Sequence, residues 1–139
     1  MDYRSIDIRE ILPQGEAFRM VDRLCEWSLE HTVTEFEVKA DNYFVGDGRF
    51  SVSGLTENIA QTSAARIGYY HKYVLHTPVS IGFIGAVQGL KVMRLPEVGE
   101  RLTTSIDVTA EAFGMVSFDA EIRDADGQPI ATGRMKTAE

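Results

Sequence analysis

The stretch Ser51–Val74, SVSGLTENIAQTSAARIGYYHKYV, most constrains what this chain can fold into, because no other segment reads as a substantial helix. Between Ser53 and Tyr73 its only formal charges are Glu57, Arg66 and Lys72. A helix on the surface of a globular protein usually carries a broad charged face, and this stretch has none. We therefore expect a helix that is buried nearly all round, with the rest of the chain packed around it.

On a helix of 3.6 residues per turn, this stretch has a bulky side and a small side. Small residues recur at intervals of four, which predicts that a sheet approaches this side closely. Glu57 and Gln61 lie on the same small side. The small side consists of Ala60, Ala64 and Gly68, and the bulky side of Leu55, Ile59, Thr62, Tyr69, Tyr70 and Tyr73.

The start of the helix holds the best candidate for chemistry. With Ser53 or Gly54 as the N-cap, Glu57 falls in the first turn, where free N–H groups and the helix dipole favour an ionised carboxylate. An acid beside the amide of Gln61, on a helix with few other charges, is a plausible acid/base group. The alternative is purely structural, because first-turn glutamates often only stabilise the helix.

Alternating apolar residues predict strands on both sides of this helix. The pattern is clear over Arg101–Ala110, where Leu102, Thr104, Ile106 and Val108 share one side. Consecutive strands with short turns indicate an antiparallel sheet with one face on the helix. We expect an α+β fold in one domain over residues 1–139, a single curved antiparallel sheet wrapped around one long central helix. The expected strands are Phe18–Glu26, His31–Lys39, Val79–Met93, Arg101–Ala110, Met115–Asp124 and Gln128–Lys136.

Composition excludes several classes of partner. A net charge of -7 and a pI near 5.0 argue against nucleic acid or an anionic membrane surface as a partner. The N-terminal residues do not resemble a signal peptide, and no apolar run approaches the ~20 residues that span a bilayer. The single cysteine, Cys25, suits a reducing cytoplasm and is expected to be a packed thiol. We expect a cytoplasmic protein without a cofactor or metal, since no set of residues has ligand spacing.

Three blocks of sequence resemble the hotdog-fold FabZ family, the 3-hydroxyacyl-(acyl carrier protein) dehydratases. Residues 11–23, ILPQGEAFRMVDR, resemble the opening LPHRxPFLLVDR of that family. Glu57-Asn58-Ile59-Ala60-Gln61 resembles its central-helix ExxAQ. Residues 83–100, beginning Phe83-Ile84-Gly85, resemble its FxGxxxxKxxxxPGD stretch. The chain also resembles the divergent ApeP-like dehydratases of polyene pathways, in which the loop before the helix is remodelled.

The resemblance implies an acyl-thioester site at a dimer interface, with a tunnel for the acyl chain beside the helix. In such enzymes a loop histidine takes the α-proton, and the helix glutamate handles the hydroxyl that leaves as water. Backbone N–H groups at the helix start polarise the thioester carbonyl. Glu57 matches the family's catalytic glutamate, and the substrate-binding positions fall on Gly54, Leu55, Gln61 and Gly85.

The chain departs from this pattern at the catalytic histidine. Where the family has GHFPG, this sequence reads Gly46-Asp47-Gly48-Arg49-Phe50, so Asp47 stands at the histidine position, and Gln14 replaces the histidine of LPH. Asp47 and Glu57 could share the acid and base work if burial raised the pKa of one of them. Asp47 could equally be the first residue of an ordinary Asp-Gly turn.

Three functions stay open on the sequence. The first is a dehydratase, or enoyl hydratase, acting on thioesters of acyl carrier protein or coenzyme A in fatty-acid or polyene-type biosynthesis. The second is a hotdog thioesterase, in which the helix carboxylate activates water or attacks the carbonyl without a histidine. The third is a non-catalytic acyl-binding subunit of a hetero-oligomer whose other subunit supplies the histidine. A homodimer or larger homo-oligomer is the expected assembly for an active enzyme.

Overall fold

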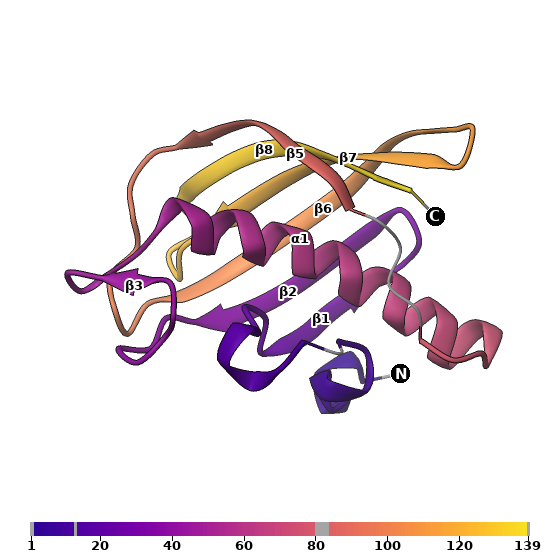
Figure 1. Cartoon of the computed structure of the whole chain (residues 1–139), viewed down its shortest axis with the longest axis horizontal. Coiled ribbons are helices and arrows are strands. Elements are labelled where there is room, and N and C mark those ends of the chain that lie inside the picture. The colour runs from indigo at the N-terminus through magenta and orange to yellow at the C-terminus, as the bar shows by residue number, and fades with distance from the viewer. Residues whose placement is uncertain (1, 13, 80–83, 139) are drawn as a thin grey trace.

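The computed structural model describes residues 2–12, 14–79 and 84–138. One antiparallel sheet of six strands, in the order β1-β2-β6-β7-β8-β5, curves around the single long helix α1 (Figure 1). This arrangement confirms the predicted α+β fold. The sheet contains β1 (Arg23–Trp27), β2 (His31–Glu37), β5 (Ile84–Val92), β6 (Arg101–Ala112), β7 (Met115–Arg123) and β8 (Pro129–Ala138), while β3 (Val45–Gly46) and β4 (Arg49–Phe50) form a separate hairpin before α1 (Val52–Tyr69).

Alternation along the strands places the core between the sheet and the helix. In β7, Val116, Phe118, Ala120 and Ile122 are buried, and the residues between them are more exposed. They pack in one cluster with Leu55 of α1 and other residues of the helix and its preceding hairpin. The predicted one-sided sheet around a buried helix is therefore confirmed by the packing.

The first predicted strand is shorter than expected. It was predicted to begin at Phe18, but Phe18 ends a 3-10 turn, Glu16–Phe18, and β1 begins only at Arg23. The reason is that helix side chains bind the main chain of Phe18 and Met20, which removes these groups from strand pairing. The β3–β4 hairpin lies between β2 and α1, where no strand was predicted. The predicted strand Val79–Met93 is seen from Ile84 onward, with 80–83 outside the described residues.

The small side of α1 faces the N-terminal segment rather than the sheet, so that expectation was wrong. A Cβ on Gly68 would lie 2.1 Å from the carbonyl oxygen of Ile11. Ala64 packs in a second apolar cluster with Ile8 and Leu12. These N-terminal residues form short 3-10 turns, Tyr3–Ser5 and Ile8–Glu10, which lie against the helix. Small residues thus let a backbone approach the helix, but the approaching chain is residues 8–12.

Aromatic residues fill the far end of the same cluster. The ring of Tyr69 lies 4.5 Å from Trp27, 5.4 Å from Tyr3 and 5.0 Å from Tyr73, measured between centroids. Tyr69 is buried here as part of the core. Past Tyr69 the chain continues as a π-helical turn, Tyr70–Leu75, and ends with His76 in the left-handed conformation.

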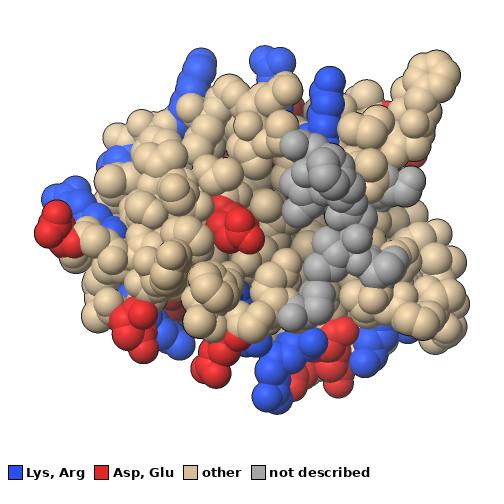
Figure 2. Space-filling model, viewed as in Figure 1, with Lys and Arg blue, Asp and Glu red and all other residues tan. Residues whose placement is uncertain are grey.

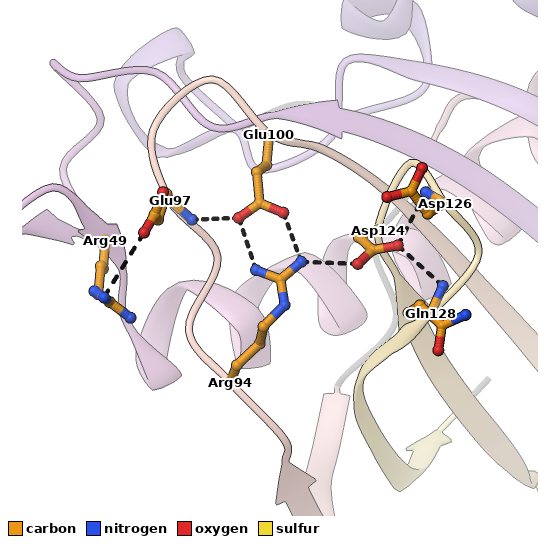
Figure 3. Close-up of polar contacts among 7 residues, drawn as sticks. All are labelled: Arg49, Arg94, Glu97, Glu100, Asp124, Asp126 and Gln128. Carbon is orange, nitrogen blue, oxygen red and sulfur yellow. Dashed lines mark hydrogen bonds and ion pairs between the residues drawn. The ribbon is translucent and has the colours of Figure 1, made fainter.

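A charged network ties the β5–β6 connection to the β7–β8 hairpin (Figure 3). Arg94 donates two hydrogen bonds to Glu100, at 2.6 and 2.7 Å, and one to Asp124, at 2.8 Å. Asp124 also accepts the N–H groups of Asp126 and Gln128, which closes the hairpin turn. Arg94 and Glu100 belong to the third block that resembles the FabZ family, and here they hold two loops together.

Candidate functional site

The cap of α1 lies earlier than the sequence suggested. Ser51 is the N-cap, and its hydroxyl accepts the N–H of Gly54 at 3.2 Å. The first turn therefore contains no acidic residue, and Glu57 lies in the second turn. Because the dipole effect falls off within the first turn, the helix end stabilises the Glu57 carboxylate less than expected.

Gln61 connects Glu57 to the segment before β1. Its side-chain N–H₂ donates to Glu57 Oε1 at 3.0 Å and to the carbonyl of Phe18 at 2.7 Å. Its Oε1 accepts the N–H of Met20 at 2.6 Å. Gln61 is fully buried, so these bonds fix its amide and orient the carboxylate one turn away. The predicted neighbours Glu57 and Gln61 are thus in direct contact.

One oxygen of Glu57 remains available. Among the described residues, no hydrogen bond or ion pair involves its Oε2, and the side chain is partly exposed. The face of the molecule across which α1 runs in Figure 1 is largely uncharged in Figure 2, and most charged side chains stand around its edge. A fixed carboxylate with one open oxygen on such a face can accept or donate a proton at a bound substrate.

The N–H groups of Gly54 and Leu55, expected to bind a thioester carbonyl, already have partners. Gly54 donates to the Ser51 hydroxyl, and Leu55 donates to the Ser51 carbonyl at 3.0 Å. Within the described part of the chain, the N–H groups of Val52 and Ser53 make no hydrogen bond, and both residues are exposed. Ser53 precedes Glu57 by four residues, so its N–H lies on the same side of the helix.

Gly54 has a packing role. A Cβ at this position would lie 2.5 Å from two ring carbons of Phe50 and 2.9 Å from Phe44 Cβ. Phe50 is fully buried in the main core. The glycine that matches the FabZ family therefore lets the hairpin before the helix pack directly onto its first turn.

Asp47 lies in the turn of the β3–β4 hairpin. Asp47 and Gly48 have φ values of 53° and 75°, the left-handed pair expected of a two-residue type I′ turn. The side chain is exposed, and no hydrogen bond links it to Glu57 in the described structure. Its geometry is that of the ordinary Asp-Gly turn that the sequence left open.

Three other positions of the matching blocks are placed only by their main chain or lie outside the described residues. Gly85 lies in β5, the edge strand after the helix. Phe83, which opens the same sequence block, and Pro13 of the first block lie outside the described residues.

The histidines and the cysteine occupy other places. His31 Nδ1 lies 2.6 Å from Asp107, its cross-strand partner, and Nε2 lies 3.6 Å from Glu26. His71 is fourteen residues along the helix from Glu57, about 21 Å at 1.5 Å per residue. Burial, together with the charge of Glu35, raises the pKa of the Cys25 thiol to about 11, which makes it a poor nucleophile.

Sequence reasoning missed Asn58. This fully buried side chain donates to the carbonyl of Met20 at 2.7 Å and accepts the hydroxyl of Thr104 at 2.5 Å. The available signal was a polar residue at a position facing the core, next to the candidate glutamate.

No group of three or more potential metal ligands occurs within residues 2–12, 14–79 and 84–138. Over these same ranges, no helix is both long and apolar enough to cross a membrane.

Solved structures with the same fold include dehydratase and thioesterase proteins. The dehydratase heterocomplex ApeI:P from Xenorhabdus doucetiae matches with a TM-score of 0.87 and 19% identity, over 98% of this chain and 92% of that chain. The zebrafish thioesterase superfamily member 2 matches with a TM-score of 0.72 and 15% identity, over 94% and 91% of the two chains. The E. coli PaaI protein from the phenylacetic acid degradation operon matches with a TM-score of 0.65 and 16% identity, over 84% of this chain and 81% of that chain. At these identities the matches establish the hotdog fold.

No curated protein sequence matches this chain significantly. The profile of the ApeP-like family, described as ApeP dehydratase, matches residues 6–139, which is nearly the whole chain. The match includes the segment before β1, the helix with Glu57 and Gln61, and the Arg94 network. The chain therefore belongs to the ApeP-like dehydratase family.

Proposed function

We propose that this protein is a subunit of a FabZ-like dehydratase that acts on 3-hydroxyacyl or 2-enoyl thioesters in polyene-type biosynthesis, with Glu57 as its acid/base group. The observation that carries the proposal is the Glu57 carboxylate, which Gln61 fixes through one oxygen while the other stays open. Family membership supports the class of reaction. Acyl carrier protein is the carrier we expect, and coenzyme A is the alternative.

The reaction needs two proton transfers at one acyl group. In dehydration, the α-carbon C2 loses a proton, the C3 hydroxyl leaves as water, and a C2=C3 double bond forms. In this proposal Glu57 gives its proton to the leaving hydroxyl, and in hydration it takes a proton from the attacking water. The free N–H groups of Val52 and Ser53, on the same helix end, would bind the thioester carbonyl as charge builds on its oxygen.

Among the described residues, neither Asp47 nor a histidine is placed beside Glu57 to act as the base for the α-proton. Asp47 lies in an exposed turn, and His71 is about 21 Å along the helix. We infer that a second hotdog subunit supplies this base, as a loop histidine, at a shared interface. The heterocomplex formed by the similar dehydratase structure supports this division of labour.

An apolar hollow offers room for the acyl chain. It measures about 430 Å³ and is lined mainly by apolar side chains, among them Ile67, Tyr70 and Met115. Ile67 follows Glu57 by ten residues on α1, which corresponds to about 15 Å along the axis. An acyl chain that begins at Glu57 and follows the helix would reach this hollow with its distal end.

A thioesterase is the second candidate. It is favoured by the missing histidine, because a helix carboxylate can activate water for attack on the thioester without one. The thioesterase structures with the same fold support it at the level of architecture.

Mass spectrometry of acyl-pantetheine thioesters separates these candidates. The purified protein is incubated with a 2-enoyl thioester, alone and together with a FabZ-like subunit that retains the loop histidine. We expect a gain of one water that requires both subunits and falls by at least about 100-fold with Glu57→Gln, as for loss of an essential acid/base group. Asp47→Asn is the matched control and should retain activity.

Other outcomes would contradict the proposal. Loss of the acyl group with release of thiol, abolished by Glu57→Gln, would establish the thioesterase instead. Full activity of Glu57→Gln in the two-subunit mixture would exclude Glu57 as the acid/base group. Full hydration by this chain alone, lost with Asp47→Asn, would return the base to Asp47.

A further inference from the structure

A chain of buried polar groups crosses the contact between α1 and the sheet. Thr34 of β2 and Thr104 of β6 are direct cross-strand partners, and both face the helix. The Thr34 hydroxyl lies 2.8 Å from that of Thr62, and the Thr104 hydroxyl lies 2.5 Å from Asn58 Oδ1. Thr62 donates to the main-chain carbonyl of Asn58 at 2.8 Å. These four side chains are all essentially inaccessible to water.

Stability alone does not explain why these positions are polar. They lie where a buried helix meets a sheet, and apolar side chains of similar size usually pack at such contacts without loss of folding stability. A buried polar network, in contrast, fixes one arrangement of the elements it joins, because any other arrangement leaves its groups unpaired. Here the fixed element is the segment that carries the Gln61 contacts.

The network reaches the candidate site through Asn58. Its side-chain N–H₂ donates to the carbonyl of Met20, while Gln61 binds the N–H of the same residue and the carbonyl of Phe18. The two amides thus clamp the main chain of 18–20 from adjacent turns of α1. Gln61 uses its remaining N–H to hold Glu57.

We propose that Asn58, held by Thr104, is a positioning residue that sets the place of segment 18–20 and, through Gln61, the orientation of the Glu57 carboxylate. This inference rests on the proposed role of Glu57. It adds the sheet strand β6 to the site, although Thr104 lies 47 residues from Glu57 in the sequence. Asn58 acts only through the segment and Gln61, and does not touch the substrate in this arrangement.

Thr104→Val and Thr34→Val form a matched pair for the test. Each removes one buried hydroxyl while keeping the shape of the side chain, and the two positions are opposite each other in the sheet. Only Thr104→Val leaves Asn58 Oδ1 without its donor, whereas Thr34→Val affects Thr62. Thr104→Ser keeps the hydroxyl and should restore the native behaviour.

The first readout is hydrogen exchange of the Met20 amide, measured by NMR without substrate. We expect exchange to become at least about tenfold faster in Thr104→Val than in Thr34→Val, and to return to the native rate in Thr104→Ser. Asn58→Asp is a second variant, because its carboxylate still accepts from Thr104 but cannot donate to the Met20 carbonyl. It should also speed exchange at Met20.

The second readout is the kinetics of the two-subunit mixture. We expect Thr104→Val to lower kcat about tenfold with little change in KM, and Thr34→Val to leave both near native values. Equal effects of the two valine variants on exchange or on kcat would overturn the inference and leave a purely structural network. Failure of the proposed function would give a different result, namely full activity of Glu57→Gln. The hydrogen-exchange result at Met20 does not depend on whether Glu57 is the acid/base group.

Discussion

Replacing Gly68 by alanine tests whether the N-terminal segment packs directly on the backbone of α1. In a helix interior, this change normally stabilises a protein by about 1 kcal/mol. Here the new Cβ would lie 2.1 Å from Ile11 O and 3.1 Å from Ile11 Cβ, so the Ile11 carbonyl must move by roughly 1 Å to reach ordinary contact. Ile11 and Leu12 are fully buried, and such overpacking costs about 1–3 kcal/mol before any gain in propensity.

Because the clash is with a main-chain carbonyl and not with the end of a flexible side chain, the cost should be about 2–3 kcal/mol, and we expect Gly68→Ala to destabilise the fold by a net of about 1–2 kcal/mol despite the better helix former. For a chain of this size, the midpoint of thermal unfolding should fall by about 3–8 °C. Circular dichroism melts and urea titrations at one protein concentration measure the change. Gly46→Ala is the control, since a Cβ there meets nothing within 4 Å and the φ angle suits an L-residue. A midpoint that rises or stays unchanged in Gly68→Ala would refute the close approach of residues 8–12.

Three further predictions concern charge, thiol reactivity and turn geometry. Arg94 lowers the pKa of Glu100 and of Asp124 through hydrogen bonds, so Arg94→Met should reduce the melting temperature at pH 7. The difference in melting temperature between the variant and the native chain should shrink as the pH falls below 4.5, because both carboxylates then take up protons. Cys25, with a pKa of about 11 against an ordinary 9.0, should react with iodoacetamide at pH 8 about 100-fold more slowly than in urea, and equal rates would contradict its burial. Phe113 is fully exposed and has a φ of 55°, a left-handed conformation that asparagine adopts more readily. Phe113→Asn should therefore stabilise the fold by about 1 kcal/mol in a thermal melt of the isolated chain. A lower melting temperature would show instead that the ring packs on the fold.

Local patterns in the sequence were enough to predict most of the architecture. The scarcity of charge over 51–74 predicted a buried helix, and the alternation in β6 and β7 predicted which side of each strand is buried; the packing confirms both. Asp126-Gly127, a dipeptide typical of hairpin turns, lies between β7 and β8. Glu57 and Gln61 were predicted together because they are four residues apart on one helix, a relation that local geometry fixes.

The remaining site depended on contacts between distant residues. The N-cap at Ser51, and not at Ser53 or Gly54, moved Glu57 into the second turn and left the N–H groups of Val52 and Ser53 without a hydrogen bond to any described residue. Ser51, Ser53 and Gly54 are all acceptable caps, so the sequence could not choose among these neighbours. The choice follows from the preceding hairpin, whose Phe50 ring packs against Gly54.

The sequence by itself determined the long helix, the order of the main-sheet strands and the four-residue spacing of Glu57 and Gln61 on α1, because each follows from propensity and periodicity within a few residues. Only the tertiary structure decided that Asn58 and Gln61 bind the main chain around Met20, about 40 residues away, and that Thr104 anchors Asn58. It also placed residues 8–12, rather than the sheet, on the small side of α1. The physical reason is that a buried amide or a small residue needs a partner, but its own sequence does not specify which distant segment provides it.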